Sequence, residues 1–304
     1  VDTLKGYTAP DFFADLIAGL TVGLIALPLA MAFAIASGVQ PDAGIFTAVI
    51  AGFIISALGG TKVAIGGPTG AFIVILYGIY AKYGAENMAI CTMMAGVILF
   101  VMGAARLGTM IKFIPYPVTM GFTSGIAVLI FTTQIKDFFG LTVDKVPSEF
   151  VEKMGALFDH VETFQWSTLA LAAASLAIIV LWPKPWQRRV PGSIVALVLG
   201  TIAVALFQLP VETIGSKFGG IPQALPTPHL PVLSWENIRH LFQPAITIAL
   251  LAAIESLLCA VVADGMIDDR HDSNQELMAQ GIANIVSPLF GGIAATGAIA
   301  RTAT

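Results

Sequence analysis

Apolar runs long enough to cross a membrane recur along almost the whole chain. A spanning helix needs about 20 mostly apolar residues, because the hydrocarbon core of a bilayer is about 30 Å thick. The chain contains roughly nine full or partial runs of this kind and the start of a tenth. Only 11% of its 304 residues are charged, too few to coat a soluble protein of this size. We therefore predict an all-α polytopic membrane protein in contact with the lipid bilayer.

The apolar runs give the order of the predicted spans. We expect spans at residues 16–37, 43–58, 61–83, 87–104, 117–133, 166–181, 193–209, 244–264 and 276–289, and a further span that begins near Thr296. A mixed-charge loop with an amphipathic stretch around Phe150–Phe158 should separate the fifth span from the sixth. A Pro/Gly-rich loop should precede the eighth.

Charge and composition also narrow the location and the class of protein. With a cytoplasmic N-terminus, more Lys and Arg residues fall inside than outside, as the positive-inside rule requires. We therefore expect a multi-pass protein of the cell (inner) membrane in this orientation. The net charge of −4 is too small to bear on nucleic-acid binding, and because no Lys/Arg run suggests a basic patch, no nucleic-acid partner is predicted. Neither cysteines nor histidines show ligand spacing, so no metal or cofactor is predicted, and without a catalytic constellation no enzyme.

Two of the predicted spans are broken. The third contains Gly66-Gly67-Pro68 and leaves a helix only from about Thr69 to Tyr83, roughly 21 Å long and too short to cross the bilayer alone. The last span follows the break at Gly291-Gly292 and should begin a helix near Thr296. A short extended segment is expected before each half-helix.

The two breaks look like copies of one element. Thr-Gly-Ala occurs at residues 69–71 and again at 296–298, and the same spacing carries Pro28 of the first span onto Glu255 of the eighth. The odd number of intervening spans means that the second copy should cross the membrane inverted. Inverted repeats with broken spans at matching positions are typical of secondary transporters.

A half-helix that begins inside the membrane predicts an anion site. Its first N–H groups lack partners, and its dipole places partial positive charge at the same end. Two such ends that face one another would bind a small inorganic or carboxylate anion. Thr69 and Thr296 should cap the helices and donate to the anion, while Gly70 and Gly297 should allow close approach to the backbone. The alternative is that these glycines only pack helix crossings.

The neighbouring positions complete the predicted site. Ala71 and Ala298 supply further backbone amides, and Phe72 lies in the first turn of the third span. Arg301 follows Thr296 by about one and a half turns, so its guanidinium should return toward the Thr296 end. An arginine inside the membrane is a functional candidate. The alternative is an arginine that snorkels to the interface.

Glu255 should lie near the middle of the eighth span. Charge is costly at that depth, so an unpaired carboxylate would take up a proton readily. This predicts a proton-coupling residue beside the anion site, with protons as a second partner. The alternative is a structural pair between Glu255 and Arg301, and the two interpretations are compatible in one transport cycle.

Several motifs resemble the SulP family of anion transporters, the sulfate permease family that includes prestin and pendrin. These are ALPLAMA at 26–32, Gly67-Pro68-Thr69, IESLLCAVVADGM at 254–266 and GGIAATGAIARTAT at 291–304. The resemblance covers the whole chain, and the motifs resemble above all those of the dicarboxylate-transporting DauA-like branch. It implies a secondary active transporter for sulfate or a C4-dicarboxylate, proton-coupled or exchanging.

The resemblance also implies an architecture. It is a 7+7 inverted repeat like that of uracil permease, of which about ten of fourteen spans would lie in this chain. Residues 1–135 would hold core spans 1–4 plus gate span 5, residues 136–235 the gate spans 6–7, and residues 236–304 the second part of the core. Core and gate would move in an elevator-type mechanism. The remaining spans and a regulatory STAS domain would lie beyond Thr304, and the full-length protein would be a homodimer.

Other functions stay open at this stage. Bicarbonate-transporting members use a sodium site where this chain has Glu255, Cys259 and Ile299, and the missing hydroxyls argue against sodium coupling. A nucleobase permease shares the implied fold but needs hydrogen-bonding side chains for a mostly neutral substrate. An anion channel or voltage-responsive motor could use the same core.

Overall fold

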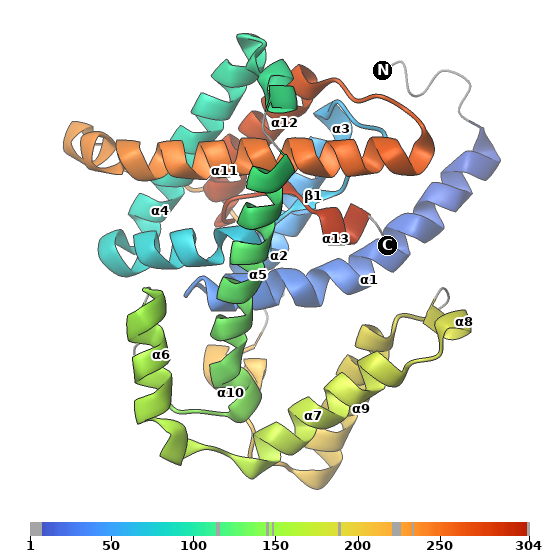
Figure 1. Cartoon of the computed structure of the whole chain (residues 1–304), viewed down its shortest axis with the longest axis vertical. Helices are drawn as coiled ribbons and strands as arrows, with labels where there is room; N and C mark the ends of the chain where they lie inside the picture. Colours follow the sequence, from blue (N-terminus) through green and yellow to red (C-terminus); the bar gives the residue numbers. More distant parts are fainter. Residues whose placement is uncertain are drawn as a thin grey trace. The chain divides into compact units, whose positions relative to one another are not determined.

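The computed structural model describes residues 8–113, 116–143, 146–147, 149–187, 190–220, 226–232 and 234–302. The chain forms two compact units, which are Val1–Phe122 with Ile221–Thr304 (the first unit) and Thr123–Gly220 (the second unit). Helices dominate both units, as predicted (Figure 1).

The first unit contains the helices on either side of the predicted breaks. In chain order its elements are α1 (Ala9–Ala36), α2 (Pro41–Phe46), a π-helix (Thr47–Ala51), α3 (Gly52–Leu58), β1 (Gly66–Gly67), a 3-10 helix (Gly70–Phe72), α4 (Ile73–Ala104), a 3-10 helix (Leu107–Phe113), α11 (Trp235–Ile267), α12 (Ser273–Val286), a 3-10 helix (Ser287–Phe290), β2 (Thr296–Gly297) and α13 (Ile299–Thr302).

The second unit is built from shorter helices. Helix α5 (Tyr116–Phe139) starts in the first unit and continues into the second. The other elements are α6 (Phe150–Asp159), a 3-10 helix (Val161–Thr163), α7 (Trp166–Leu181), α8 (Lys184–Gln187), α9 (Gly192–Phe207) and α10 (Ile214–Phe218). The amphipathic stretch predicted after the fifth span is α6, and α10 is an unpredicted helix in the Pro/Gly-rich loop.

Four stretches of the described residues are long and apolar enough to cross a membrane. They are Ala9–Ala36, Pro41–Leu58, Gly70–Ala104 and Trp235–Ile267. The third stretch joins two predicted spans, but Gly84 interrupts it with φ 82° and ψ 175°. Figure 1 shows the resulting bend in α4. The part before Gly84 is therefore the short half-helix that the sequence predicts.

Two helices begin earlier than predicted because polar residues cap them. Thr8 and Asp11 form a capping box, so α1 starts at Ala9 rather than at Leu16. The Ser234 hydroxyl accepts a hydrogen bond of 3.2 Å from the Asn237 amide, so α11 starts at Trp235 and includes Pro244. Apolar patterning alone misses such starts, because the first turns of both helices carry charged residues.

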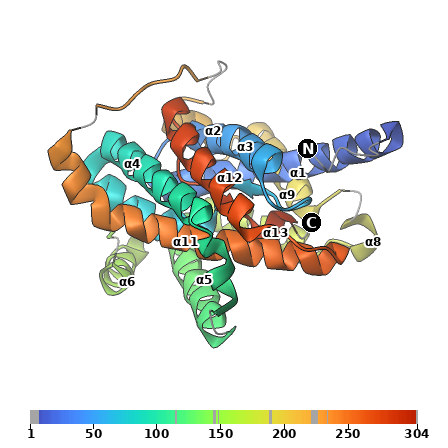
Figure 2. The same cartoon turned by 90° about the horizontal axis from the view of Figure 1, so that it is seen from above.

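Close contact between α4 and α12 organises the first unit, and Figure 2 shows the two helices side by side. At their crossing the backbones touch through glycines. A Cβ atom at Gly96 would lie 2.7 Å from the carbonyl oxygen of Gly281 and from the amide of Ile285. Small residues let membrane helices approach this closely and pack by van der Waals contact.

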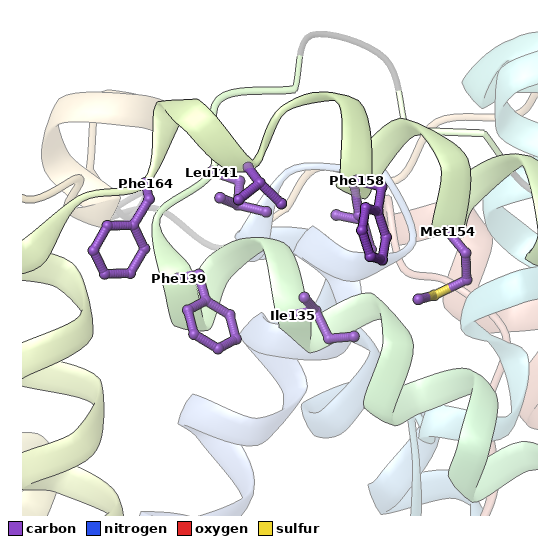
Figure 3. A pocket seen from close by; sticks show the side chains of 8 residues that line it. Ile135, Phe139, Leu141, Met154, Phe158 and Phe164 are labelled. Carbon is purple, nitrogen blue, oxygen red and sulfur yellow. The ribbon is translucent and has the colours of Figure 1, made fainter.

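The second unit has an apolar core of its own, beside α6. Leu141, Val143 and Leu157 are buried together. A cavity of about 190 Å³ adjoins them, and Ile135 and Phe139 of α5 and Met154 and Phe158 of α6 line it (Figure 3). This packing explains why the loop after α5 forms an amphipathic helix.

The glycine contact predicts a position-specific effect of added methyl groups. Gly96→Ala should destabilise the protein by about 1–3 kcal/mol, because the methyl group overlaps α12 backbone. Gly78→Ala is the matched control in the same element, since a Cβ there meets nothing within 4 Å. Thermal unfolding in detergent measures both. Equal melting temperatures for the two variants would show that α4 and α12 are not in this contact.

Candidate anion-binding site

The two predicted breaks lie side by side. Strand β1 pairs with β2 in antiparallel register, with Gly66 opposite Gly297 and Gly67 opposite Thr296. The Ala298 amide extends the pair and donates to the Ile65 carbonyl at 2.8 Å. Segments more than 200 residues apart therefore satisfy one another's backbone groups, which membrane lipid cannot do.

The start of the half-helix after β1 carries free backbone donors. The Phe72 amide closes the first turn onto the Thr69 carbonyl at 3.3 Å. The amides of Gly70 and Ala71 have no acceptor in the described part of the chain, and both residues are buried. Buried N–H groups without partners are rare and costly. An anion would supply the missing acceptors, and the helix dipole favours it there.

The Thr69 side chain differs from its prediction. It does not cap the helix, because its hydroxyl donates to Glu255 Oε2 at 3.0 Å. Thr69 is buried, and a hydrogen bond to an ionised carboxylate is stronger than one to a neutral acceptor. Glu255 thus contacts the residue directly before the free amides of Gly70 and Ala71.

Thr296 and its neighbours also differ from their predicted roles. Thr296 belongs to β2 and its hydroxyl donates to the Ala252 carbonyl at 3.0 Å, so it caps no helix. Gly297 packs on α11, where a Cβ would lie 2.8 Å from Cys259 Cβ. The Ala298 amide donates to the Ile65 carbonyl, and the helix begins at Ile299 rather than near Thr296.

Arg301 connects the two breaks. Its side chain is 4% exposed, which does not fit a snorkelling arginine. The guanidinium Nη2 donates to the Pro68 carbonyl, so the side chain crosses to the other break instead of returning to Thr296. Gly67 has φ 153° and no side chain, which leaves space for the guanidinium. A Cβ at this position would lie 2.7 Å from Arg301 Nη1. In the described part of the chain, Arg301 and Glu255 form no ion pair within 4 Å.

Polar residues of α12 that sequence reasoning missed hold the two extended segments. Glu276, Gln280 and Asn284 are all buried. The Asn284 side chain makes two hydrogen bonds to Ala295, donating to its carbonyl at 2.8 Å and accepting from its amide at 2.9 Å. Their spacing of four residues, a polar stripe along an apolar helix, is the signal that could have found them.

Thr47 adds a similar link from the second span. Its hydroxyl accepts from the Ile293 amide at 2.7 Å, in the segment that leads to β2. A single threonine in an apolar run does not allow this hydrogen bond to be predicted from the sequence.

The residues brought together can bind an anion and a proton in one place. Gly70 and Ala71 offer amides, Arg301 offers a full positive charge, and Phe72 is buried in the first turn beside them. Glu255 is the acidic group next to these donors. Amide and guanidinium groups can donate hydrogen bonds to a small oxyanion, and a carboxylate beside them would interact with its charge.

Comparison with known proteins finds relatives along almost the whole chain. A family model described as "Sulfate permease family" matches residues 12–304. The chain is 50% identical over 301 residues to YvdB of Bacillus subtilis (strain 168), a protein with a provisional name as a sulfate transporter. The alignment covers 99% of this chain and 57% of YvdB. The chain spans about half the length of the curated relatives it matches.

Solved structures show the same fold. The transmembrane domain of a cyanobacterial bicarbonate transporter, BicA, superposes with a TM-score of 0.81 at 33% identity, covering 95% of this chain and 74% of that one. The murine anion transporter Slc26a9 in its inward-facing state gives a TM-score of 0.86 at 20% identity, covering 99% of this chain and 54% of that one.

The chain belongs to the sulfate permease family, a family of multi-pass membrane transporters. This confirms the predicted fold class and the prediction that the chain is not an enzyme. It confirms the family resemblance at the level of the family.

The hydrogen bond between Thr69 and Glu255 predicts a side-chain-specific effect on stability. Thr69→Val should lower the free energy of unfolding by about 1.5–3 kcal/mol, because a bond to a carboxylate is lost. Thr69→Ser keeps the hydroxyl and is the control. Thermal unfolding in detergent compares them, and a valine variant as stable as the serine variant would contradict the contact.

Proposed function

We propose that the protein is a secondary active transporter for a small anion, with its binding site at the start of the half-helix after β1. One observation carries the proposal. Among the described residues, the buried amides of Gly70 and Ala71 lack acceptors, and the Arg301 guanidinium donates to the Pro68 carbonyl, two residues before Gly70. A dipole end together with a buried positive charge attracts an anion and disfavours a neutral substrate such as a nucleobase.

Glu255 is proposed to couple this site to protons. Its carboxylate bonds to Thr69, directly before Gly70, so an ionised Glu255 opposes a bound anion. At a charge separation of about 7 Å and an effective dielectric near ~20, this repulsion is about 2–3 kcal/mol. Protonation of Glu255 removes it and favours anion binding, which supports symport or proton-linked exchange.

The substrate is proposed to be sulfate or a C4-dicarboxylate. The family description and the name of YvdB support sulfate, and the DauA-like motifs support a dicarboxylate. Bicarbonate is the second candidate, because BicA is similar over 95% of this chain. Cys259 and Ile299, in place of hydroxyl ligands, argue against a sodium-coupled form of that function.

The wider architecture is part of the same proposal. Residues 1–135 and 236–304 would supply the core spans with the fifth span of the gate, and residues 136–235 the rest of the gate. An elevator-type movement of core against gate would carry the anion across the cell (inner) membrane. The N-terminus would be cytoplasmic, and the full-length protein a homodimer.

Uptake by proteoliposomes of the full-length protein tests the proposed function. Labelled sulfate, succinate and bicarbonate would be offered in turn, with and without an inward proton gradient. Saturable, gradient-stimulated uptake of one of them is expected. Gradient-independent electrical conductance of the anion would instead support a channel or motor.

Arg301 should contribute to affinity for the anion. Arg301→Ala should weaken binding by about 1–3 kcal/mol, the range for hydrogen bonds to charged groups. Arg270→Ala removes an exposed arginine instead and should bind normally. Calorimetry with the transported anion measures both, and unchanged affinity in Arg301→Ala would remove Arg301 from the site.

Glu255 should set the dependence on the proton gradient. Uptake by the wild type should rise as external pH falls through the range in which Glu255 takes up its proton. Glu255→Gln resembles the protonated state permanently, so it should bind and exchange the anion without gradient stimulation. Counterflow and gradient-driven uptake separate these activities.

Two results would overturn this role for Glu255. A Glu255→Gln variant still driven fully by the gradient would place the coupling group elsewhere. A variant that binds no anion at any pH would make Glu255 a structural residue of the site.

A further inference from the structure

The Glu276 carboxylate collects hydrogen bonds from three separate parts of the first unit. Oε2 accepts from the Gly60 amide at 2.9 Å and from the Thr61 hydroxyl at 3.4 Å. Oε1 accepts from the Ser256 hydroxyl at 3.2 Å and from the Gln280 amide group at 2.9 Å. The side chain is 1% exposed. These four partners are all neutral, and the described part of the chain places no cation within 4 Å of the carboxylate.

These bonds hold the segment that leads into β1. The Gly60 carbonyl accepts from the Asp272 amide at 3.0 Å while the Gly60 amide donates to Glu276, so this residue is held from both sides. A Cβ at Gly60 would lie 2.0 Å from the Asp272 carbonyl oxygen. The backbone at Gly60 therefore packs directly against the start of α12, and a side chain at this position would not fit.

The same carboxylate also holds the turn of α11 that carries Glu255. Ser256, its partner on α11, directly follows Glu255 in sequence. Glu255 binds Thr69 at the far end of the segment, while Glu276 binds Gly60 and Thr61 at the near end. Thr69 is therefore bonded directly to Glu255, and Gly60 is linked through Glu276 to Ser256. Both ends of the segment are held by adjacent residues of α11.

We propose that Glu276 is a positioning residue of the transport site, which fixes the segment 59–69 against the Glu255 turn of α11. The proposal rests on the proposed function for its transport readout. Errors of about 1 Å in the placement of a reacting or binding group cost up to a hundredfold in activity. Glu276 lies outside the predicted anion site and acts through Gly60 and Ser256.

Gln280 makes a conservative variant possible. Its buried Oε1 atom has no hydrogen-bond partner among the described residues, so the amide can flip and accept from a new donor. Glu276→Gln keeps one oxygen for Gly60 and Thr61, and offers its amide nitrogen to Ser256 and to the flipped Gln280. Glu276→Ala removes both halves of the network.

The test compares these variants in the full-length protein. In hydrogen exchange, Glu276→Ala should expose the amides of residues 59–69, whereas Glu276→Gln should protect them like the wild type. In proteoliposomes, Glu276→Ala should raise the KM for the transported anion by about ten- to a hundredfold per inserted carrier, and Glu276→Gln should restore most of it. Glu236→Ala, at an exposed glutamate of α11, is the control.

The outcomes separate this proposal from the proposed function. Normal KM in Glu276→Ala, once corrected for the amount inserted, would overturn the positioning role. So would unchanged exchange of residues 59–69. Exchange that responds as expected in a protein that transports none of the tested anions would instead contradict the proposed function and leave Glu276 as the group that holds the segment.

Discussion

Backbone amides and carbonyls inside a membrane must find partners within the protein, and the first unit is arranged around this requirement. Lipid offers no hydrogen bonds, so each break in a span would leave costly orphan groups. The two breaks resolve this by pairing as β1 and β2. The Asn284 side chain accepts a hydrogen bond from the Ala295 amide, and the Thr47 hydroxyl accepts one from the Ile293 amide. After these bonds are made, the amides of Gly70 and Ala71, between β1 and α4, have no acceptor among the described residues.

Three consecutive residues bring the charges of the site together. The Pro68 carbonyl accepts from Arg301, the Thr69 hydroxyl donates to Glu255, and the Gly70 amide has no acceptor in the part of the chain that the structure describes. A movement of this tripeptide therefore changes the surroundings of the positive charge, the acid and the donor at once. Arg301 and Glu255 form no direct ion pair among the described residues, so the proposed coupling between proton and anion would run through this short connection.

The sequence predicts the parts of this arrangement that depend on chain breaks and apolar length. Gly66-Gly67-Pro68 and Gly291-Gly292 mark breaks that the structure confirms, and Glu255 and Arg301 stand out as charges in apolar runs. It does not predict where hydroxyls point, because Thr69 and Thr296 each have tertiary partners that local rules cannot see. Local rules miss Glu276 for the same reason, because its hydrogen-bond donors come from the loop before β1, from α11 and from α12. Helix starts were missed where caps outweighed hydropathy, as at Thr8 and Ser234.

The central claim is that the free amides after the first break bind the transported anion. Selenate has the shape and charge of sulfate and scatters X-rays anomalously, so a crystal of the full-length protein with bound selenate would locate the anion directly. The account predicts an anomalous peak within hydrogen-bonding reach of the Gly70 and Ala71 amides and beside the Arg301 guanidinium. A selenate ion bound elsewhere in the protein, with this position empty, would contradict it.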